Sequence, residues 1–185
     1  MAAPFSDLGF ALGIVRGART FLLTTDGWLT GLYYRQVWLP GEINHATCRK
    51  EGGYVHLPDN RDDVILLPDN QEHYETIDKA HMLLPEERCG FYGYYDGSND
   101  YNPPANPKRD MVSGVVEGFG SVLIGERGFR AQKARIVALQ IPKNYPKRYE
   151  RIIMRYASVP MFTSFRDMMK AFPCEDGSPD EEVGE

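Results

Sequence analysis

Residues 89–141 read CGFYGYYDGSNDYNPPANPKRDMVSGVVEGFGSVLIGERGFRAQKARIVALQI, and this stretch decides the fold class. It holds three runs rich in aromatic and β-branched residues, which fit a pleated, half-buried surface. These runs cover residues 91–95, 112–124 and 129–141. We therefore predict three antiparallel strands in this part of the chain.

The connections between the three runs follow from their turn residues. Gly125 to Gly128 (GERG) predicts a tight turn between the second and third strands, while residues 96–110 are rich in Asn, Pro, Gly and Asp and predict a long exposed connection. Three glycines interrupt the second run, which is typical of bulges or close backbone approach. They are Gly114, Gly118 and Gly120.

An opening hairpin is predicted ahead of this core. Residues 13–23 (GIVRGARTFLL) and 28–38 (WLTGLYYRQVW) have strand character, and Asp26-Gly27 between them is a common hairpin turn. We expect this hairpin to pair with the later strands. Residues 71–84 (QEHYETIDKAHMLL) carry apolar residues at helical spacing and predict a short helix.

After Ile141 the apolar period changes from 2 to 3.6. A helix is predicted from Pro146, burying residues 149, 152, 153 and 156 and leaving Lys147, Arg148, Arg151 and Arg155 on its other faces. A second helix is predicted after Ser164, burying Phe165, Met168, Met169 and Phe172. The expected fold is α+β: a curved antiparallel sheet, or a small partly open β-barrel, with two C-terminal helices. We expect one domain over residues 1–173 and an acidic tail over 174–185.

Composition limits the class of protein. The 185 residues are 42% hydrophobic, enough for one packed domain, and no apolar run approaches the roughly 20 residues of a membrane helix. The N-terminus lacks the basic region of a secretory signal, so we expect a soluble, cytoplasmic protein that does not enter membranes. Three cysteines without a C-x-x-C argue against a disulfide scaffold.

The net charge of -5 is unevenly distributed. Residues 59–100 hold eleven acidic and three basic side chains, whereas residues 127–155 hold nine basic side chains and one acid. Such asymmetry can mark a surface for nucleic acid or membrane. The alternative is that the blocks neutralise each other or form solvated faces.

Several short motifs follow one another in a fixed order: WLPG at 38–41, ATC at 46–48, CGFYG at 89–93, VSGVVEGFG at 112–120, GFRAQKA at 128–134 and RYASVP at 155–160. Their order and spacing resemble an uncharacterised protein family of actinobacteria and their phages. The resemblance covers roughly residues 28–160 and suggests a phage-encoded protein of the host cytoplasm or the virion. It implies no mechanism, because that family has no settled activity.

The resemblance also implies a candidate zinc site. Members of the family tend to show a cysteine, a histidine followed closely by proline, and a C-x-C-G. Here Cys48 and Cys89 occupy the outer positions, His56 or His81 is the candidate histidine, and Glu87 replaces the first cysteine of the C-x-C pair. Structural zinc favours thiolate and imidazole, so this set is unusual. The alternative is that both cysteines are small buried hydrophobes.

No catalytic residue is predicted, because the chain has no nucleophile elbow, P-loop, zinc-protease helix or dinucleotide fingerprint. Glu117 and Arg130 flank the predicted turn at 125–128, which suggests a structural ion pair or a polar pocket shared with the tyrosines of the GFYGYY strand. The candidate ligand- or partner-binding residues are Tyr92, Tyr94, Glu117, Arg130 and Lys133.

Three functional hypotheses follow. The first is a non-catalytic binding or assembly module that engages a protein partner. The second is a nucleic-acid-binding barrel that uses an aromatic and basic face, with stacking side chains at 91–95 and cations at Arg127, Arg130, Lys133 and Arg135. The third is an enzyme acting on a small polar ligand near Glu117 and Arg130.

Overall fold

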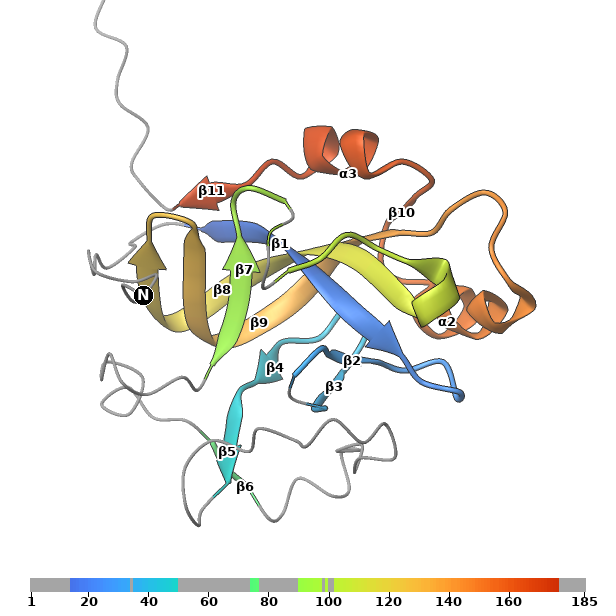
Figure 1. Ribbon diagram of the computed structural model, residues 1–185. Coiled ribbons are helices and arrows are strands. Elements are labelled where there is room, and N and C mark those ends of the chain that lie inside the picture. Colours follow the sequence, from blue (N-terminus) through green and yellow to red (C-terminus); the bar gives the residue numbers. More distant parts are fainter. Residues whose placement is uncertain are drawn as a thin grey trace, which may run out of the picture.

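The computed structural model describes residues 14–33, 35–49, 74–76, 90–97, 99 and 102–176. Figure 1 shows a mixed α+β fold in which a strongly bent sheet carries short helices around it. The strands are β1 (Val15–Leu23), β2 (Leu29–Gly31), β3 (Val37–Trp38), β4 (Asn44–His45), β5 (Thr47–Arg49), β6 (Tyr74–Thr76), β7 (Phe91–Tyr94), β8 (Met111–Gly125), β9 (Gly128–Gln140), β10 (Met161–Phe162) and β11 (Glu175–Asp176). The helices are η2 (Pro107–Arg109), η3 (Lys147–Tyr149), α2 (Glu150–Arg155) and α3 (Phe165–Ala171).

The long β8–β9 hairpin is the centre of the sheet. Its strands have 15 and 13 residues and pair from Gly114↔Leu139 to Gly125↔Gly128, as the turn at 125–128 predicts. Two register shifts interrupt the pairing, between Val115 and Val116 and between Phe119 and Val122. Irregularities of this kind bend a strand and increase its twist. The other edge of β8 pairs antiparallel with β1, which confirms that the opening hairpin joins the later strands.

Four strands of this sheet form a ring of hydrogen bonds. β1 pairs with β8, β8 with β9, β9 with β7, and β7 returns to β1 through Ala18↔Tyr94. Strands β2, β3, β4, β10 and β11 extend this sheet outside the ring, with β10 parallel to β9, whereas β5 and β6 form a separate two-stranded sheet. The fold is therefore a curved, mostly antiparallel sheet that closes on itself locally and is not a complete barrel, as the sequence predicts.

The ring closes tightly because glycines face its interior. A Cβ on Gly93 would lie 2.5 Å from the Phe129 ring, and a Cβ on Gly118 would lie 2.6 Å from the same ring. Real side chains do not approach so closely, since packed interiors have no spare volume. Phe129 is fully buried and fills the space that these two glycines leave.

The two C-terminal helices cover opposite faces of the sheet. Ile152 of α2 joins the main core with Val116, whereas Met168 of α3 packs with Val115 and Ala138 in a second cluster. Val115 and Val116 are consecutive strand residues and so point to opposite faces. Figure 1 shows α3 above the sheet and α2 at its right-hand end. Ser164 caps α3 by accepting a hydrogen bond from the Asp167 N–H, as its sequence position predicts.

Three local expectations are corrected. Residues 28–38 form two short strands, because β2 and β3 pair with each other and Leu29 faces Trp38 across a hairpin. Tyr74–Thr76 is strand β6, which pairs with β5, so the helix predicted for residues 71–84 is wrong at these three positions. Pairing with a strand distant in the sequence has outweighed the helical spacing of the apolar residues. The rest of that stretch lies outside the described residues.

The third correction concerns the connection expected to be exposed. Asn102 lies in this connection yet is 2% exposed, and its side chain accepts a hydrogen bond from the Thr20 N–H at 2.6 Å. At the start of the predicted acidic tail, Glu175 and Asp176 form β11, which pairs with β1. Among the described residues, no helix has the length and apolar character that crossing a bilayer requires.

Candidate functional site

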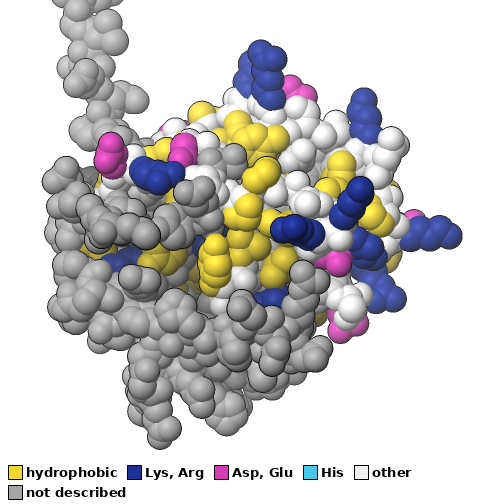
Figure 2. Space-filling view, in the orientation of Figure 1, with side chains coloured by type: hydrophobic (Ala, Val, Ile, Leu, Met, Phe, Trp, Pro, Cys, Tyr) yellow, Lys and Arg dark blue, Asp and Glu magenta, His cyan; other side chains and the backbone are white. Residues whose placement is uncertain are grey.

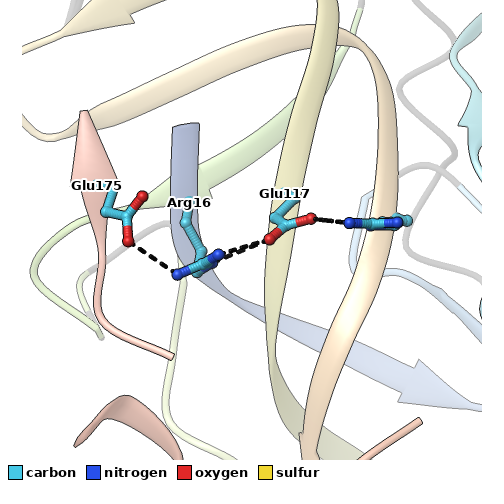
Figure 3. A network of polar contacts seen from close by, with 4 residues as sticks. Arg16, Glu117 and Glu175 are labelled. Atoms are coloured by element: carbon cyan, nitrogen blue, oxygen red, sulfur yellow. Dashed lines mark hydrogen bonds and ion pairs between the residues drawn. The ribbon is translucent and has the colours of Figure 1, made fainter. Parts of the chain in front are cut away.

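A row of four charged side chains crosses four neighbouring strands. Glu175, Arg16, Glu117 and Arg135 are successive register partners on β11, β1, β8 and β9. Arg16 donates from Nη1 to Glu175 at 2.9 Å and from Nη2 to Glu117 at 2.6 Å, and Arg135 Nη2 lies 2.7 Å from the other Glu117 oxygen. Figure 3 shows Arg16 lying between the two carboxylates. Alternating charges at directly opposed positions stabilise a sheet.

Glu117 is the buried member of this charge ladder. Its side chain is 5% exposed, whereas the Arg135 side chain is 44% exposed. Burial alone would raise the pKa of Glu117, but the hydrogen bonds from Arg16 and Arg135 outweigh burial and hold that pKa below its usual value. Both carboxylate oxygens are used by arginines, so the geometry supports a structural role for Glu117 and leaves it no free edge for substrate.

The structure does not bring Glu117 and Arg130 together. Glu117 faces Arg135 across the hairpin, while Arg130 faces Leu123 on one side and Tyr92 of β7 on the other. Five residues of extended strand separate Arg130 from Arg135, roughly 16 Å. Arg130 itself is 2% exposed. The polar pocket that the sequence suggested between Glu117 and Arg130 is therefore not formed.

The other predicted binding residues lie on neighbouring strands. Tyr94 faces Gly128 of β9 and Ala18 of β1, and burial raises its pKa to about 12. Lys133 faces His45 of β4 and Phe119 of β8, and it is partly exposed. Of the five predicted residues, only Tyr92 and Arg130 are direct register partners among the described strands.

The predicted nucleic-acid face does not present its residues together. Phe91 is 4% exposed and packs in the main core, with its ring centroid 4.3 Å from that of Trp38. Arg130 is buried as well. A stacking platform needs exposed rings beside exposed cations, and these two residues supply neither.

The predicted zinc ligands belong to the part of the chain around β5 and beyond it. The backbone of Cys48 belongs to β5, but its side chain and residues His56, His81, Glu87 and Cys89 lie outside the described residues.

The described surface does contain a candidate site that the sequence did not indicate, around α2. Helix α2 buries Ile152 and is followed by the buried Tyr156, which leaves Arg151, Met154 and Arg155 facing outward. Met154 is 71% exposed, the largest exposure among the described large hydrophobic side chains that reach the surface. An apolar side chain on the polar face of a helix was the available sequence signal.

Two hollows are lined by residues of α2 and of the chain around it, and Met154 lines the first of them. The first has a volume of about 650 Å³ and is lined by Asp26, Trp28, Arg151, Met154 and Arg155. The second has a volume of about 490 Å³ and is lined by Ile153, Ala157, Ser158, Val159, Pro160 and Met161. We call these eleven residues the α2 surface.

The turn between β1 and β2 holds the arginines of the α2 surface in place. Arg151 Nη1 donates to the Thr25 carbonyl at 2.6 Å, and Arg155 Nη2 donates to the Asp26 carbonyl at 3.2 Å. Gly27 allows this contact, because it has a φ of 84° and a Cβ there would lie 2.6 Å from the Arg151 Cβ. The Arg155 guanidinium carbon lies 3.7 Å from the Trp28 ring centroid, a cation–π contact.

Basic side chains surround the α2 surface. Arg148 of η3 donates to the Pro107 carbonyl at 2.5 Å and forms an ion pair with Asp110, so η2 lies beside η3. Figure 2 shows Lys and Arg side chains gathered on the right-hand part of the molecule, where α2 lies in Figure 1. Seven exposed cations belong to these helices and the chain around them: Lys108, Arg109, Lys143, Lys147, Arg148, Arg151 and Arg155.

Fold and site together define an α+β protein with a bent sheet, a ladder of alternating charges centred on the buried Glu117, and a basic helical surface. No family model matches the chain, and no solved structure matches it. Part of the chain is similar to the Protein OS-9 homolog of Emericella nidulans, with 30% identity over 87 residues. The match covers 46% of this chain and 17% of that protein, so the two share a short segment only.

Proposed function

We propose that the protein is a non-catalytic binding module that engages an acidic protein partner through the α2 surface. The observation that carries this proposal is Met154, which is 71% exposed and lines the same hollow as the Arg155–Trp28 pair. Aromatic residues, Met and Arg are the residues enriched at protein interfaces. Methionine adapts its shape to different apolar partners.

The charge around the α2 surface defines the chemistry of the partner. Seven exposed cations lie on η2, η3, α2 and residue 143, while the acidic side chains near them include Asp26, Asp110 and Glu150. A surface with an excess of positive charge attracts negatively charged proteins and speeds their encounter. The second hollow, which Ile153, Pro160 and Met161 help to line, then supplies contact area for an uncharged side chain of the partner.

The arginines of this surface are held before any partner arrives. Arg151 and Arg155 each donate to a backbone carbonyl of the β1–β2 turn, and Arg155 is also stacked on Trp28. Side chains that are already ordered lose less conformational entropy on binding. The ordered state of Arg151 and Arg155 supports a role for these arginines in recognition, and argues against a surface that only contacts solvent.

Nucleic acid is the second candidate partner, because aromatic rings accompany the same cations. Trp28 lies under Arg155, and Tyr145 is 37% exposed with its ring 6.4 Å from that of Tyr149. Such rings can stack on bases. The apolar lining of the second hollow, with Ile153 and Met161, favours a protein over a polyanion. An enzyme acting beside Glu117 receives less support, because that carboxylate is fully paired.

Membership of the actinobacterial and phage family, suggested by the motif order, would place the partner among phage or host proteins. On the same basis, the protein would be located in the host cytoplasm or associated with the virion.

Site-specific photo-crosslinking tests the proposal. A photoreactive amino acid at position 154 should give a discrete protein adduct in the cells that produce the chain, and the same group at the exposed Glu126 should not. Arg155→Glu should abolish the adduct, whereas Arg166→Glu on α3, over the other face of the sheet, should leave it. An adduct formed equally from both positions would contradict the proposal. A salt-sensitive adduct with nucleic acid alone would favour the second candidate.

A further inference from the structure

Asp26 contacts both of the arginines that line the first hollow of the α2 surface. Its backbone carbonyl accepts a hydrogen bond from Arg155 Nη2 at 3.2 Å, and its carboxylate lies 3.9 Å from Arg151 Nη1. The same Arg151 nitrogen donates to the preceding carbonyl, that of Thr25, at 2.6 Å. The two guanidinium groups are therefore held at consecutive carbonyls of one turn, and a single small anion at that turn can reach both of them.

The turn that holds the two arginines is closed by hydrogen bonds of its own. The Gly27 N–H donates to the Thr24 carbonyl at 3.0 Å, and the Thr24 N–H donates to the Trp28 carbonyl at 2.9 Å. The Trp28 N–H in turn donates to the Thr24 hydroxyl at 3.0 Å. Groups that are ordered before binding lose less conformational entropy when a ligand arrives.

Each of the two arginines keeps most of its donors for a ligand. Arg151 uses Nη1 and Arg155 uses Nη2 to hold the turn, and their other guanidinium nitrogens make no hydrogen bond with the described residues. The donors of a guanidinium lie in its plane, so the stacking of Arg155 on Trp28 does not block them. The hollow thus presents two planar sets of donors side by side.

The carboxylate of Asp26 is a loose counter-charge for these arginines. Its side chain is 78% exposed, that of Arg151 is 59% exposed, and their separation of 3.9 Å is too long for a hydrogen bond. Exposed pairs of this kind contribute little stability. Asp26 carries the single carboxylate among the described residues that line the first hollow, against two guanidinium groups. A more strongly bound anion can therefore displace the Asp26 side chain.

The presence of Asp26 decides which anion gains most from binding here. A partner carboxylate that replaces Asp26 beside Arg151 exchanges one single charge for another. A phosphate monoester carries a charge of about −1.5 to −2 at pH 7 and three strong acceptor oxygens, so it adds charge and contacts both arginines. Arginine donors match phosphate oxygens in pairs, and arginine clusters recognise phosphorylated segments. The hollow, with a volume of about 650 Å³, has room for such a group.

From this geometry we propose that the first hollow recognises a phosphate monoester on a side chain of the protein partner. The phosphate lies between Arg151 and Arg155, and the chain on either side of it lies against Met154, which is 71% exposed. This inference rests on the proposed function, since it specifies the group that the α2 surface recognises. The exposed apolar side chain of Met154 favours a phosphorylated protein over a nucleic acid, whose backbone offers it no apolar contact.

The test is an NMR titration with three short peptides that differ at one position. Each has leucine on both sides of a central residue, which is phosphoserine, glutamate or serine. At pH 7 we expect the phosphoserine peptide to move the Nε–H signals of Arg151 and Arg155 and the indole N–H signal of Trp28, and to bind about tenfold more tightly than the glutamate peptide. The serine peptide should leave these signals in place.

Acidification and two substitutions sharpen the test. At pH 5, below the second phosphate pKa of about 6, the two charged peptides should bind within about twofold of each other. Arg151→Lys, which keeps the charge but loses the planar donors, should weaken phosphoserine binding by about tenfold at pH 7. Asp26→Asn should strengthen binding of the glutamate peptide, because it removes the competing carboxylate. Arg166→Lys on α3 is the control and should change neither affinity.

Equal affinities for the phosphoserine and glutamate peptides at pH 7 would overturn this inference. So would failure of the phosphoserine peptide to move the three signals, or tighter binding of a terminally phosphorylated oligonucleotide. The peptide comparison uses the unaltered protein, so it does not depend on how the variants fold. The photo-crosslink from position 154 reports on the proposed function by itself, because an adduct there stands even where the phosphoserine peptide fails.

Discussion

Arg155 lies over Trp28 at 3.7 Å from ring centroid to guanidinium carbon, and this contact fastens α2 to the turn between β1 and β2. The same arginine donates to the Asp26 carbonyl. Residues 127 positions apart in the sequence thereby form one surface, and the proposed binding function depends on that arrangement.

Replacing Arg155 by Ala should have a small effect on folding. The pair is partly exposed, so we expect a loss of about 0.5–1 kcal/mol in the free energy of unfolding. Urea denaturation measures the loss, and acrylamide quenching should report greater access to Trp28. Arg166→Ala on α3 is the control and should change neither. A loss above about 3 kcal/mol would show that the contact is structural rather than part of a recognition surface.

Adding one methyl group at Gly118 should be strongly destabilising. A Cβ there would lie 2.6 Å from Phe129 and 2.7 Å from Val15, inside the closed ring of strands. We expect Gly118→Ala to cost about 1–3 kcal/mol in thermal or urea unfolding. Ser121→Ala on the same strand should be nearly neutral. The double variant with Phe129→Leu should recover part of the loss, and strict additivity of the two losses would contradict this account of the ring.

Much of the fold could be predicted from the sequence because the signals were local. The turn at 125–128 and the apolar runs on either side define the β8–β9 hairpin without distant information. Ring closure was not predictable, because it depends on Gly93 and Gly118 meeting Phe129 from different strands. The strand at 74–76 was mistaken for helix for the same reason, since its partner is β5.

The candidate site was less accessible to sequence reasoning. Glu117 was expected to pair with Arg130, but its partners are Arg16 and Arg135, which come from strand register that no local pattern shows. Met154 and Trp28 belong to different ends of the chain and form one surface only after folding. The run of aromatic residues at 91–95 predicted a stacking face that included Phe91, but the Phe91 ring is buried in the core.

Neutralising Glu117 should destabilise the protein in a pH-dependent way. Glu117→Gln leaves Arg16 and Arg135 beside an uncharged group, and we expect the free energy of unfolding to fall by roughly 2 kcal/mol at pH 7. This loss is smaller than that for a fully buried ion pair, because Arg135 is partly exposed. The pKa of Glu117 is lowered in the folded state. Its contribution is therefore fully present above the unfolded pKa of about 4.3 and disappears as pH falls through the folded value.

Urea unfolding at several pH values tests this expectation. The stability difference between the natural protein and Glu117→Gln should stay constant from pH 7 to about pH 5 and shrink below about pH 4. Arg127→Gln, at an exposed ion pair with Asp96, should show little difference at any of these pH values. A Glu117→Gln difference that grows on acidification would contradict the lowered pKa.

The hydroxyl of Tyr156 should contribute measurably to stability. It accepts from the Leu29 N–H at 2.9 Å and donates to the Trp38 carbonyl at 2.6 Å, so it joins two facing residues of β2 and β3. Tyr156→Phe leaves both backbone groups buried and unpaired, and we expect a loss of about 1–3 kcal/mol in urea unfolding. Tyr145→Phe, at an exposed ring, is the control. Equal stability of the two variants would contradict this role.

We propose that an acidic protein binds the α2 surface. The most direct test of this binding is the affinity of the crosslinked partner for two charge variants of the protein. Met154→Asp removes the exposed apolar side chain and opposes the partner's charge, so titration calorimetry should show affinity reduced by about a hundredfold. Arg166→Asp, over the other face of the sheet, should stay within about twofold of the natural protein. Equal affinities for both variants, or a greater loss for Arg166→Asp, would contradict the account.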